Sequence, residues 1–229
     1  YGNVAIGSNS FQRPDGFFVI LNGGATNLSN ILDPFTMSVH QGPFTTGATP
    51  NVGGGAHTIK RPDGRFLVVL GNNNAIATGT NVYDPATNAF LAGPALIGNA
   101  QNTGGNSIQM QNGRIFMVKG GQTTTNLLDP ISTTFSAGPT VTAIGAGSFM
   151  IPRTDGKVLF ATGNNTTTSQ VYDPVSNTVT ATTQSPTLPC QVNTGGHVFQ
   201  RQTGEYVVIC GGSTASTAII DAGWNLGGT

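Results

Sequence analysis

The chain has 229 residues, of which 33 are glycine and 13 are proline, and charged residues make up only 8% of it. An average soluble protein has about 25% charged residues. Nine Lys and Arg balance nine Asp and Glu, so the net charge is zero and no basic surface is expected for a phosphate backbone or an anionic membrane. Nucleic acid is therefore excluded as a partner. No apolar run reaches the roughly 20 residues of a membrane helix, so membrane insertion is not expected either.

The remaining surface is rich in Asn, Thr, Ser and Gly. Such a surface gives little electrostatic repulsion between copies, which favours association. It is also commoner outside cells than in the crowded cytoplasm, so we expect an extracellular or cell-surface protein whose partners are copies of itself or other surface proteins. Because the chain opens with Tyr1 rather than Met, we expect a processed form or part of a longer protein.

A turn dipeptide recurs along the chain with a period of about 46 residues, which is typical of a repeat architecture. Each copy lies between two apolar runs, as expected for a two-residue hairpin turn in which both residues have positive φ. A glycine follows eight residues after the first residue of each turn. The five turns are Asp15-Gly16, Asp63-Gly64, Asn112-Gly113, Asp155-Gly156 and Thr203-Gly204, and the glycines are Gly23, Gly71, Gly120, Gly163 and Gly211.

A second signal ends the third apolar run of each repeat. It is an Asp-Pro pair at 33–34, 84–85, 129–130 and 173–174, and Asp-Ala at 221–222. Proline cannot donate to a sheet, and the aspartate can accept from the backbone two residues on, so a strand must stop there. A short fourth apolar run follows.

Four strands per repeat predict an all-β fold, a five-bladed β-propeller of four-stranded antiparallel blades. The repeats span residues 5–46, 53–97, 102–143, 145–190 and 193–229 of a single domain, 1–229, with residues 1–4 at the ring closure. A stacked β-solenoid is less favoured, because its repeats are usually shorter.

Two segments carry a family resemblance, PDGRFLVVLG at 62–71 and VYDPATNAF at 82–90. They resemble the kelch repeat of the galactose-oxidase-type propellers, although the chain has one tryptophan, Trp224, and only five repeats. The copper radical oxidases of that fold use tyrosine and histidine ligands and a cysteine bonded to a tyrosine. That pattern does not map onto the tyrosines of this chain, so such an enzyme is a remote alternative. The tyrosines are Tyr1, Tyr83, Tyr172 and Tyr206.

The acidic residues are accounted for by the repeat, since every aspartate belongs to one of the two turn types and Glu205 follows a turn. General acid–base catalysis needs a positioned carboxylate, and none is left over. We therefore expect no catalytic residue, no enzyme activity, no cofactor and no metal site. Seven basic residues share two repeat positions, where pairing with these aspartates in an inter-blade network is expected. They are Arg13, Arg61, Arg153 and Arg201, and Arg65, Arg114 and Lys157.

Ligand binding is the alternative function, and the loops between second and third strands vary most and are rich in Asn and Thr. Loops of this kind suit hydroxyl-rich partners such as glycans. One residue per repeat also stands six positions before the first turn, where structural polar contacts are favoured over a metal shared by the two histidines. The candidate binding residues are Asn73, Asn74, Asn164 and Asn165 in the loops, and Asn9, His57, Asn106, Phe149 and His197 at the second site.

The two cysteines, Cys190 and Cys210, fall at the same end of the fifth repeat. A disulfide between them is geometrically reasonable and would close a loop of about 20 residues. Two unpaired thiols at the edge of the core are the alternative.

Overall fold

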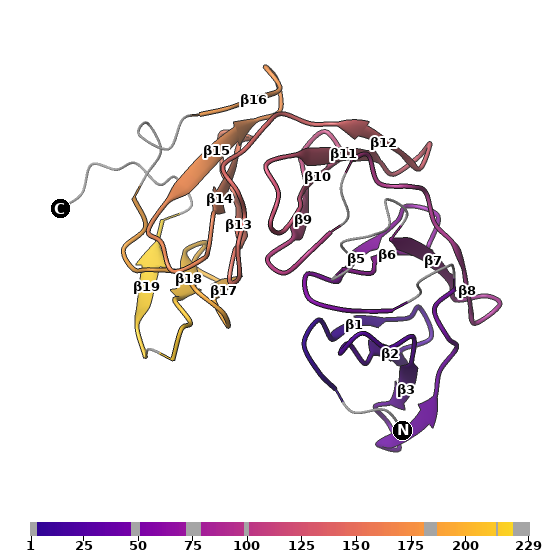
Figure 1. The fold of residues 1–229 in the computed structure, drawn as a ribbon. Coiled ribbons are helices and arrows are strands. Elements are labelled where there is room, and N and C mark those ends of the chain that lie inside the picture. Colours follow the sequence, from indigo (N-terminus) through magenta and orange to yellow (C-terminus); the bar gives the residue numbers. More distant parts are fainter. Residues whose placement is uncertain are drawn as a thin grey trace. The chain divides into compact units, whose positions relative to one another are not determined.

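The computed structural model describes residues 4–46, 51–71, 79–98, 101–180, 187–213 and 215–221, and in this part of the chain every regular element is a β-strand (Figure 1). The strands form five antiparallel sheets in chain order, and the fold is that of a five-bladed β-propeller, as the sequence predicts. Four sheets have four strands, and the fifth has three within the described residues.

The blades are numbered in chain order. Blade 1 consists of β1 (Asn9–Gln12), β2 (Phe18–Leu21), β3 (Ser29–Asp33) and β4 (Ser38–Gln41). Blade 2 consists of β5 (His57–Lys60), β6 (Phe66–Val69), β7 (Thr80–Asp84) and β8 (Ala89–Ala92). Blade 3 consists of β9 (Asn106–Gln109), β10 (Ile115–Val118), β11 (Thr125–Asp129) and β12 (Thr134–Ala137). Blade 4 consists of β13 (Met150–Pro152), β14 (Val158–Ala161), β15 (Ser169–Asp173) and β16 (Thr178–Val179). Blade 5 consists of β17 (His197–Gln200), β18 (Tyr206–Ile209) and β19 (Thr217–Ile220).

The chain forms two compact units. The first comprises Tyr1–Gly105 and Leu128–Ser136, and contains blades 1 and 2. The second comprises Asn106–Leu127 and Ala137–Thr229, and contains β9, β10 and blades 4 and 5.

The hairpins between first and second strands lie where the sequence predicts, but their turn type differs from the two-residue prediction. In blade 1, Gly16 N donates to Arg13 O (3.0 Å) and Arg13 N donates to Phe17 O (2.8 Å), so three residues form the loop. Gly16 has φ +92°, whereas Asp15 is not among the residues with positive φ. This is a type I turn followed by a bulge glycine, and it needs one left-handed residue where the two-residue turn needs two. Pro14 fits it because proline presets φ for the first central position.

The aspartates that end the third strands cap the following turn, as predicted. The carboxylate of Asp33 accepts from Phe35 N at 2.8 Å, and Asp84, Asp129 and Asp173 each accept from the amide two residues on at 2.9 Å. Each cap satisfies a backbone donor that the end of the strand leaves without a partner.

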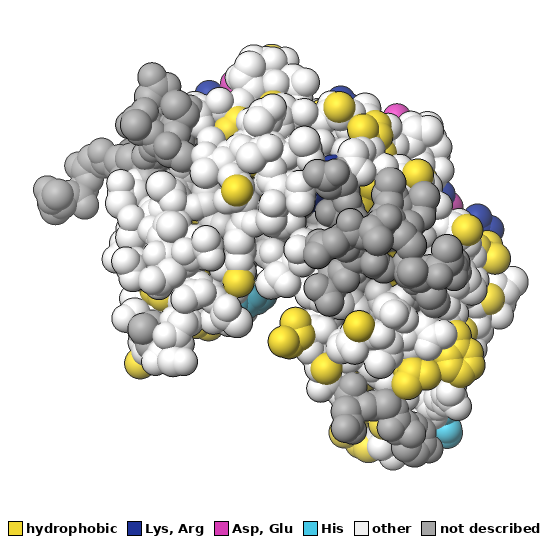
Figure 2. Space-filling model, in the orientation of Figure 1, with side chains coloured by type: hydrophobic (Ala, Val, Ile, Leu, Met, Phe, Trp, Pro, Cys, Tyr) yellow, Lys and Arg dark blue, Asp and Glu magenta, His cyan; other side chains and the backbone are white. Residues whose placement is uncertain are grey.

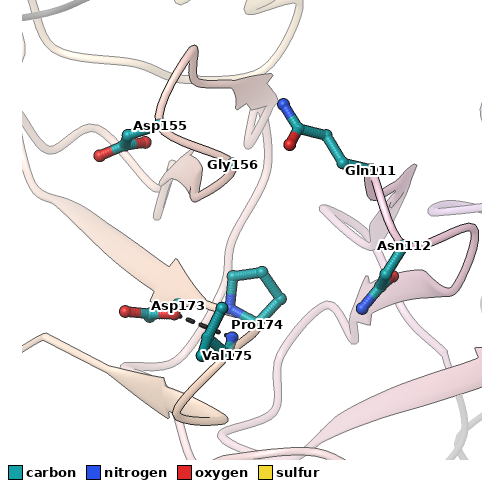
Figure 3. A pocket seen from close by; sticks show the side chains of 7 residues that line it. All are labelled: Gln111, Asn112, Asp155, Gly156, Asp173, Pro174 and Val175. Atoms are coloured by element: carbon teal, nitrogen blue, oxygen red, sulfur yellow. Dashed lines mark hydrogen bonds between the residues drawn. The ribbon is translucent and has the colours of Figure 1, made fainter.

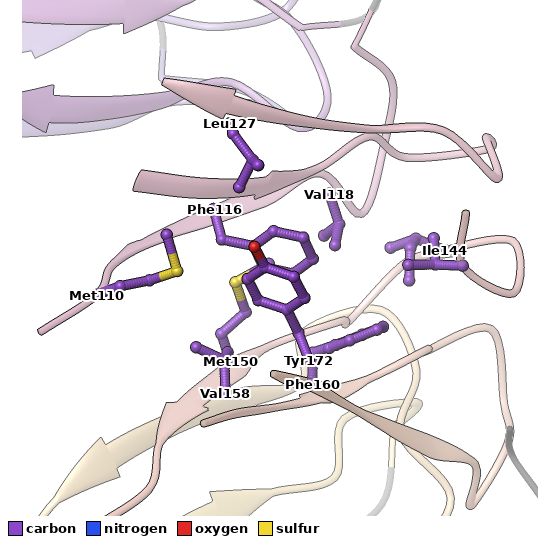
Figure 4. Close-up of a cluster of buried hydrophobic side chains, with 10 residues drawn as sticks. Met110, Phe116, Val118, Leu127, Ile144, Met150, Val158, Phe160 and Tyr172 are labelled. Atoms are coloured by element: carbon purple, nitrogen blue, oxygen red, sulfur yellow. The ribbon is translucent and has the colours of Figure 1, made fainter. Parts of the chain in front are cut away.

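The core lies between neighbouring blades rather than within them. In Figure 4, ten side chains from blades 3 and 4 and the segment between them fill one such layer, with Phe116 stacked on Tyr172 at a centroid distance of 4.1 Å. Phe11 of blade 1 stacks on Phe66 of blade 2 in the same way, at 4.4 Å. Because side chains alternate between the two faces of a strand, each blade presents an apolar face to each neighbour.

Amide side chains on third strands hold the segments that enter their blades. Asn81 accepts from Thr46 N at 2.8 Å and donates to Thr46 O at 2.9 Å. Gln170 accepts from Thr142 N at 2.7 Å. The buried amides are therefore used to satisfy linker backbone.

The glycine that follows the second strand is needed for close backbone approach in blades 1, 2, 4 and 5, at Gly23, Gly71, Gly163 and Gly211, whereas in blade 3 the positive φ falls on Gly121 rather than on the predicted Gly120. Gly71 has φ +67°, and a Cβ built on it would lie 2.5 Å from Gly54 O and 2.6 Å from Ala56 N. Gly64, in the hairpin of the same blade, has φ +81° but nothing within 4 Å of such a Cβ. Both glycines therefore have a backbone conformation that strains other residues, but only Gly71 lacks room for a side chain.

Replacing Gly71 by Ala should lower the free energy of unfolding by at least about 2 kcal/mol, because strain and backbone overlap add. Gly64→Ala, the matched control, should cost only about 1 kcal/mol, the strain alone. Urea unfolding of both variants measures the difference. Equal losses would show that the close approach of Gly71 to residues 54–56 is not tight.

Candidate functional site

Four of the five predicted residues at the second site begin the first strand of their blade: Asn9 in β1, His57 in β5, Asn106 in β9 and His197 in β17. The fifth, Phe149, directly precedes β13. Each therefore occupies the same end of its own blade.

Phe149 differs from the others because its ring is buried in the apolar layer between blades 4 and 5, together with Ile151, Leu159 and Val208. Its place in this layer explains the residue as part of the core and leaves no surface for a ligand. As a candidate binding residue, Phe149 is therefore corrected to a packing residue.

His57 is held by a backbone contact. Its Nδ1 lies 3.0 Å from Gly55 O, and its Nε2 is enclosed without a partner. Burial lowers the pKa of the ring to about 4, against the smaller opposing effect of the Gly55 hydrogen bond. At neutral pH the ring is uncharged, with Nδ1 donating and Nε2 free to accept.

Gln101 is a feature that the sequence reasoning missed. Its side chain is 1% exposed, its Nε2 donates to Gly55 O at 3.3 Å, and its Oε1 is enclosed without a partner. The equivalent residues of blades 2, 4 and 5 are aliphatic and buried, namely Val52, Ile144 and Val192. The sequence did carry a signal for this residue, because Gln101 is an amide at a repeat position that is aliphatic in the other blades.

Gly55 O thus joins His57 and Gln101, and each of the two side chains keeps one enclosed acceptor without a partner. A buried acceptor without a donor is costly, so this cluster suits a water molecule or a hydroxyl group as donor. The His57–Gln101 cluster has hydrogen-bonding capacity and no nucleophile.

Lys119, directly after β10, is fully buried although its side chain carries an ammonium group. Burial lowers the pKa of its ammonium group. The equivalent residues are Asn22, Leu70, Thr162 and Cys210, so this position accepts varied chemistry.

The variable loop of blade 4 brings predicted residues together. A pocket of about 150 Å³ is lined by Asn165, Ser216 and both cysteines, among others. Cys190 and Cys210 are joined by a disulfide, with Cα atoms 6.1 Å apart. The backbone of Asn165 is held because its N donates to Val192 O at 2.8 Å. Its amide side chain is exposed at the pocket. Asn164 is exposed beside it, and Asn73 and Asn74 lie outside the described residues.

A second pocket lies among the tight turns of blades 3 and 4, at the opposite end of the blades from the variable loops (Figure 3). It measures about 200 Å³, below the roughly 300–1,000 Å³ of typical small-molecule sites. Its two carboxylates are already engaged: Asp155 pairs with Arg153 at 3.0 Å and Asp173 with Lys157 at 3.4 Å. The Val175 amide, and to a lesser extent the Ser176 amide and Lys157, lower the pKa of Asp173.

The repeated basic residues pair with turn and strand-end acids, as predicted, but within their own blades. The hairpin pairs are Arg13–Asp15 (2.6 Å), Arg61–Asp63 (2.8 Å) and Arg153–Asp155 (3.0 Å), and Arg65 reaches Asp84 at 3.0 Å. These ion pairs lie within single blades, because each arginine lies two residues from its aspartate in one hairpin or faces the neighbouring turn of the same sheet. Arg13 makes the inter-blade contact through an amide, donating to Asn88 Oδ1 at 3.2 Å.

Within the described ranges, no three His, Cys, Asp or Glu side chains lie close enough together to hold a metal ion. The described part also has no helix long and apolar enough to cross a membrane.

No family model matches the sequence, and no curated protein matches it significantly. Solved structures do match in fold. The virginiamycin B lyase of Staphylococcus aureus is 10% identical, with a TM-score of 0.58 over 93% of this chain and 69% of its own. An auxiliary nutrient binding protein of Bacteroides ovatus is 11% identical (TM-score 0.62, 96% and 56%). The hydrazine synthase of Kuenenia stuttgartiensis is 14% identical (TM-score 0.60, 91% and 56%). The chain spans little more than half the length of the last two, and at these identities the likeness shows the fold alone.

The low pKa of His57 predicts a pH dependence of stability. The folded value of about 4 lies below the ordinary 6.5, so between these values the unfolded chain binds a proton that the folded chain excludes. The free energy of unfolding should therefore fall as the pH falls through this range, by up to about 3 kcal/mol.

His57→Asn, which copies the residue of blades 1 and 3, should remove most of this dependence. Urea unfolding at about pH 7 and pH 4.5 measures it. His197→Asn is the control, since that side chain is exposed at the equivalent position, and it should keep the dependence of the parent protein. A dependence that survives His57→Asn unchanged would contradict the assignment.

Proposed function

We propose that this chain is a non-enzymatic propeller of the kelch type that acts outside the cell or at its surface, as a structural module that associates with copies of itself. Its surface offers apolar contacts where most soluble proteins offer charge.

The observation that supports this proposal most directly is a large apolar side chain that is exposed at the same turn position in three blades. Phe35, Ile131 and Val175 each follow an Asp-Pro pair, and each is largely exposed. Isolated exposed apolar residues are normal, but repetition at one turn position in three blades is a regular surface feature. Figure 2 shows one face of the molecule, on which charged side chains are sparse and apolar ones break the surface at many points. Apolar contact without charge repulsion favours association.

The absence of enzyme activity is proposed from what the carboxylates already do. Among the described residues, six carboxylates form ion pairs with Arg or Lys at 2.6–3.4 Å. Four aspartates cap turns as described above, and two of these are also ion-paired. A catalytic acid or base needs a carboxylate that is free to exchange a proton with a substrate. Carboxylates held by cations and amides are poorly suited to that role.

Self-association predicts particles larger than one chain. Sizing with light scattering and negative-stain microscopy over a hundredfold range of concentration should show a growing assembled fraction. Because apolar contacts are not screened, the assembled fraction should persist or rise at high salt. A monomer at every concentration and salt would contradict the proposal.

Glycan binding is the second candidate, favoured by the pocket beside Asn165. An amide and a hydroxyl, from Asn165 and Ser216, line it on the variable-loop end of the blades. A nutrient binding protein of Bacteroides ovatus shares the fold. Polar side chains of this kind hydrogen-bond the hydroxyl groups of sugars.

A glycan array tests this candidate. If a sugar binds in the pocket, Asn165→Ala should weaken binding at least about tenfold, as expected for the loss of a well-placed hydrogen bond. Asn164→Ala is the matched control, because Asn164 is the adjacent exposed residue with the same left-handed backbone and does not line the pocket. No binding to any sugar would retire this candidate.

A further inference from the structure

The linkers that enter blades 2 and 4 are held by a side-chain amide from the second residue of the blade's third strand. Asn81 accepts from Thr46 N at 2.8 Å, and Gln170 accepts from Thr142 N at 2.7 Å. We call this contact the amide clamp. It needs an amide on the strand and an N–H on the linker.

Blade 5 lacks both halves of the amide clamp. The second residue of its third strand is Ala218, which has no side-chain amide. In the linker, Leu188 N donates to the loop of blade 4 at 2.7 Å, as Val141 N donates to the loop of blade 3 at 2.8 Å. The next residue is Thr142 in one linker and Pro189 in the other. Proline has no N–H to donate.

A disulfide lies where the amide clamp is missing. Cys190 follows Pro189, and its bond to Cys210 joins the linker to the end of β18. To other described residues, Pro189, Cys190 and Gln191 make no backbone hydrogen bond. The disulfide is therefore the bond that ties this three-residue segment to blade 5.

The two ends of the segment are held without the disulfide. Leu188 and Val192 are 2% and 0% exposed, in the apolar layer between blades 4 and 5. Val192 also exchanges two backbone hydrogen bonds of 2.8 Å with residues 165–166 of blade 4. Breaking the disulfide should therefore release residues 189–191 and leave the blade folded.

The same segment is part of the pocket beside Asn165. Cys190 and Gln191 line this pocket of about 150 Å³ together with Asn165, Ser216 and Cys210. All of these residues belong to the second compact unit. Cys190 is partly exposed, whereas Cys210 is 1% exposed, so a reductant reaches the sulfur of Cys190 first.

We infer that the Cys190–Cys210 disulfide is a redox-sensitive clamp that sets the shape of this pocket. The intact bond holds Cys190 and Gln191 in place as part of the pocket lining. Reduction by a dithiol releases them and changes the pocket while blade 5 stays folded. The inference rests on the proposed glycan pocket for its use, since it names the regulation of that site.

A dithiol supplies the two electrons for this step. One of its thiolates attacks Cys190 Sγ, the disulfide bond breaks, and Cys210 leaves as a thiolate that takes up a proton. The second thiolate of the reductant then displaces Cys190 from the mixed disulfide. The reductant ends as a cyclic disulfide, and its two protons end on the two cysteine thiols.

Reduction of the native protein with dithiothreitol tests the inference without a sugar. The chain has two cysteines, so their disulfide is the one target. In ¹H–¹⁵N spectra the amides of Asn165, Gln191 and Ser216 should shift clearly beyond the linewidth. Those of Asp155 and Val175, in the turns at the opposite end of the blades, should not move. Near-ultraviolet circular dichroism should show that the fold is kept.

Cys190→Ser is the matched variant. It should give the shifted spectrum without reductant, and dithiothreitol should change that spectrum no further. Three results would each overturn the inference: a disulfide that dithiothreitol reduces only in denaturant, global unfolding on reduction, or unchanged cross-peaks at the pocket when alkylation shows both thiols to be free.

A glycan array with the oxidised and the reduced protein separates the inference from the proposed function. A sugar that binds the oxidised protein should bind the reduced protein at least about tenfold more weakly. Equal binding to both forms would overturn the inference and leave the glycan candidate intact. If no sugar binds either form but the cross-peaks at the pocket shift, the glycan candidate fails and the redox-sensitive clamp stands.

Discussion

Apolar packing between neighbouring sheets is the constraint on which the rest of this structure depends. Each blade is a thin sheet of short strands with apolar side chains on both faces, so a blade is stable only when both faces are covered. Between blades 3 and 4 the cover is an aromatic stack surrounded by aliphatic side chains.

The polar residues serve this packing by ending and turning the strands. Asp33 and its equivalents cap the turn after the third strand, and Asn81 and Gln170 hold the linkers that enter their blades. Gly71 and its equivalents in blades 1, 4 and 5 let the end of a strand touch the entry loop of its own blade. The few carboxylates that the structure describes are mostly engaged in these caps or in ion pairs with Arg and Lys.

Local features were predictable from the sequence, because they depend on residues that are close along the chain. The hairpins, the strand ends and the caps of the aspartates were predicted for this reason. The turn type was not, because Asp-Gly suits two loop lengths and Pro14 favours the longer one. Features set by a neighbouring blade were also missed. The burial of Phe149, the pocket among the turns of blades 3 and 4, and the Gly55 contact of Gln101 all depend on a second sheet.

The central claim is that apolar layers between neighbouring blades hold this fold together. Urea unfolding of Phe116→Ala tests it most directly, with Phe35→Ala at an exposed turn as the control. The account predicts that Phe116→Ala lowers the free energy of unfolding by at least about 3 kcal/mol, while Phe35→Ala changes it by less than about 0.5 kcal/mol. Small and equal losses in the two variants would contradict it.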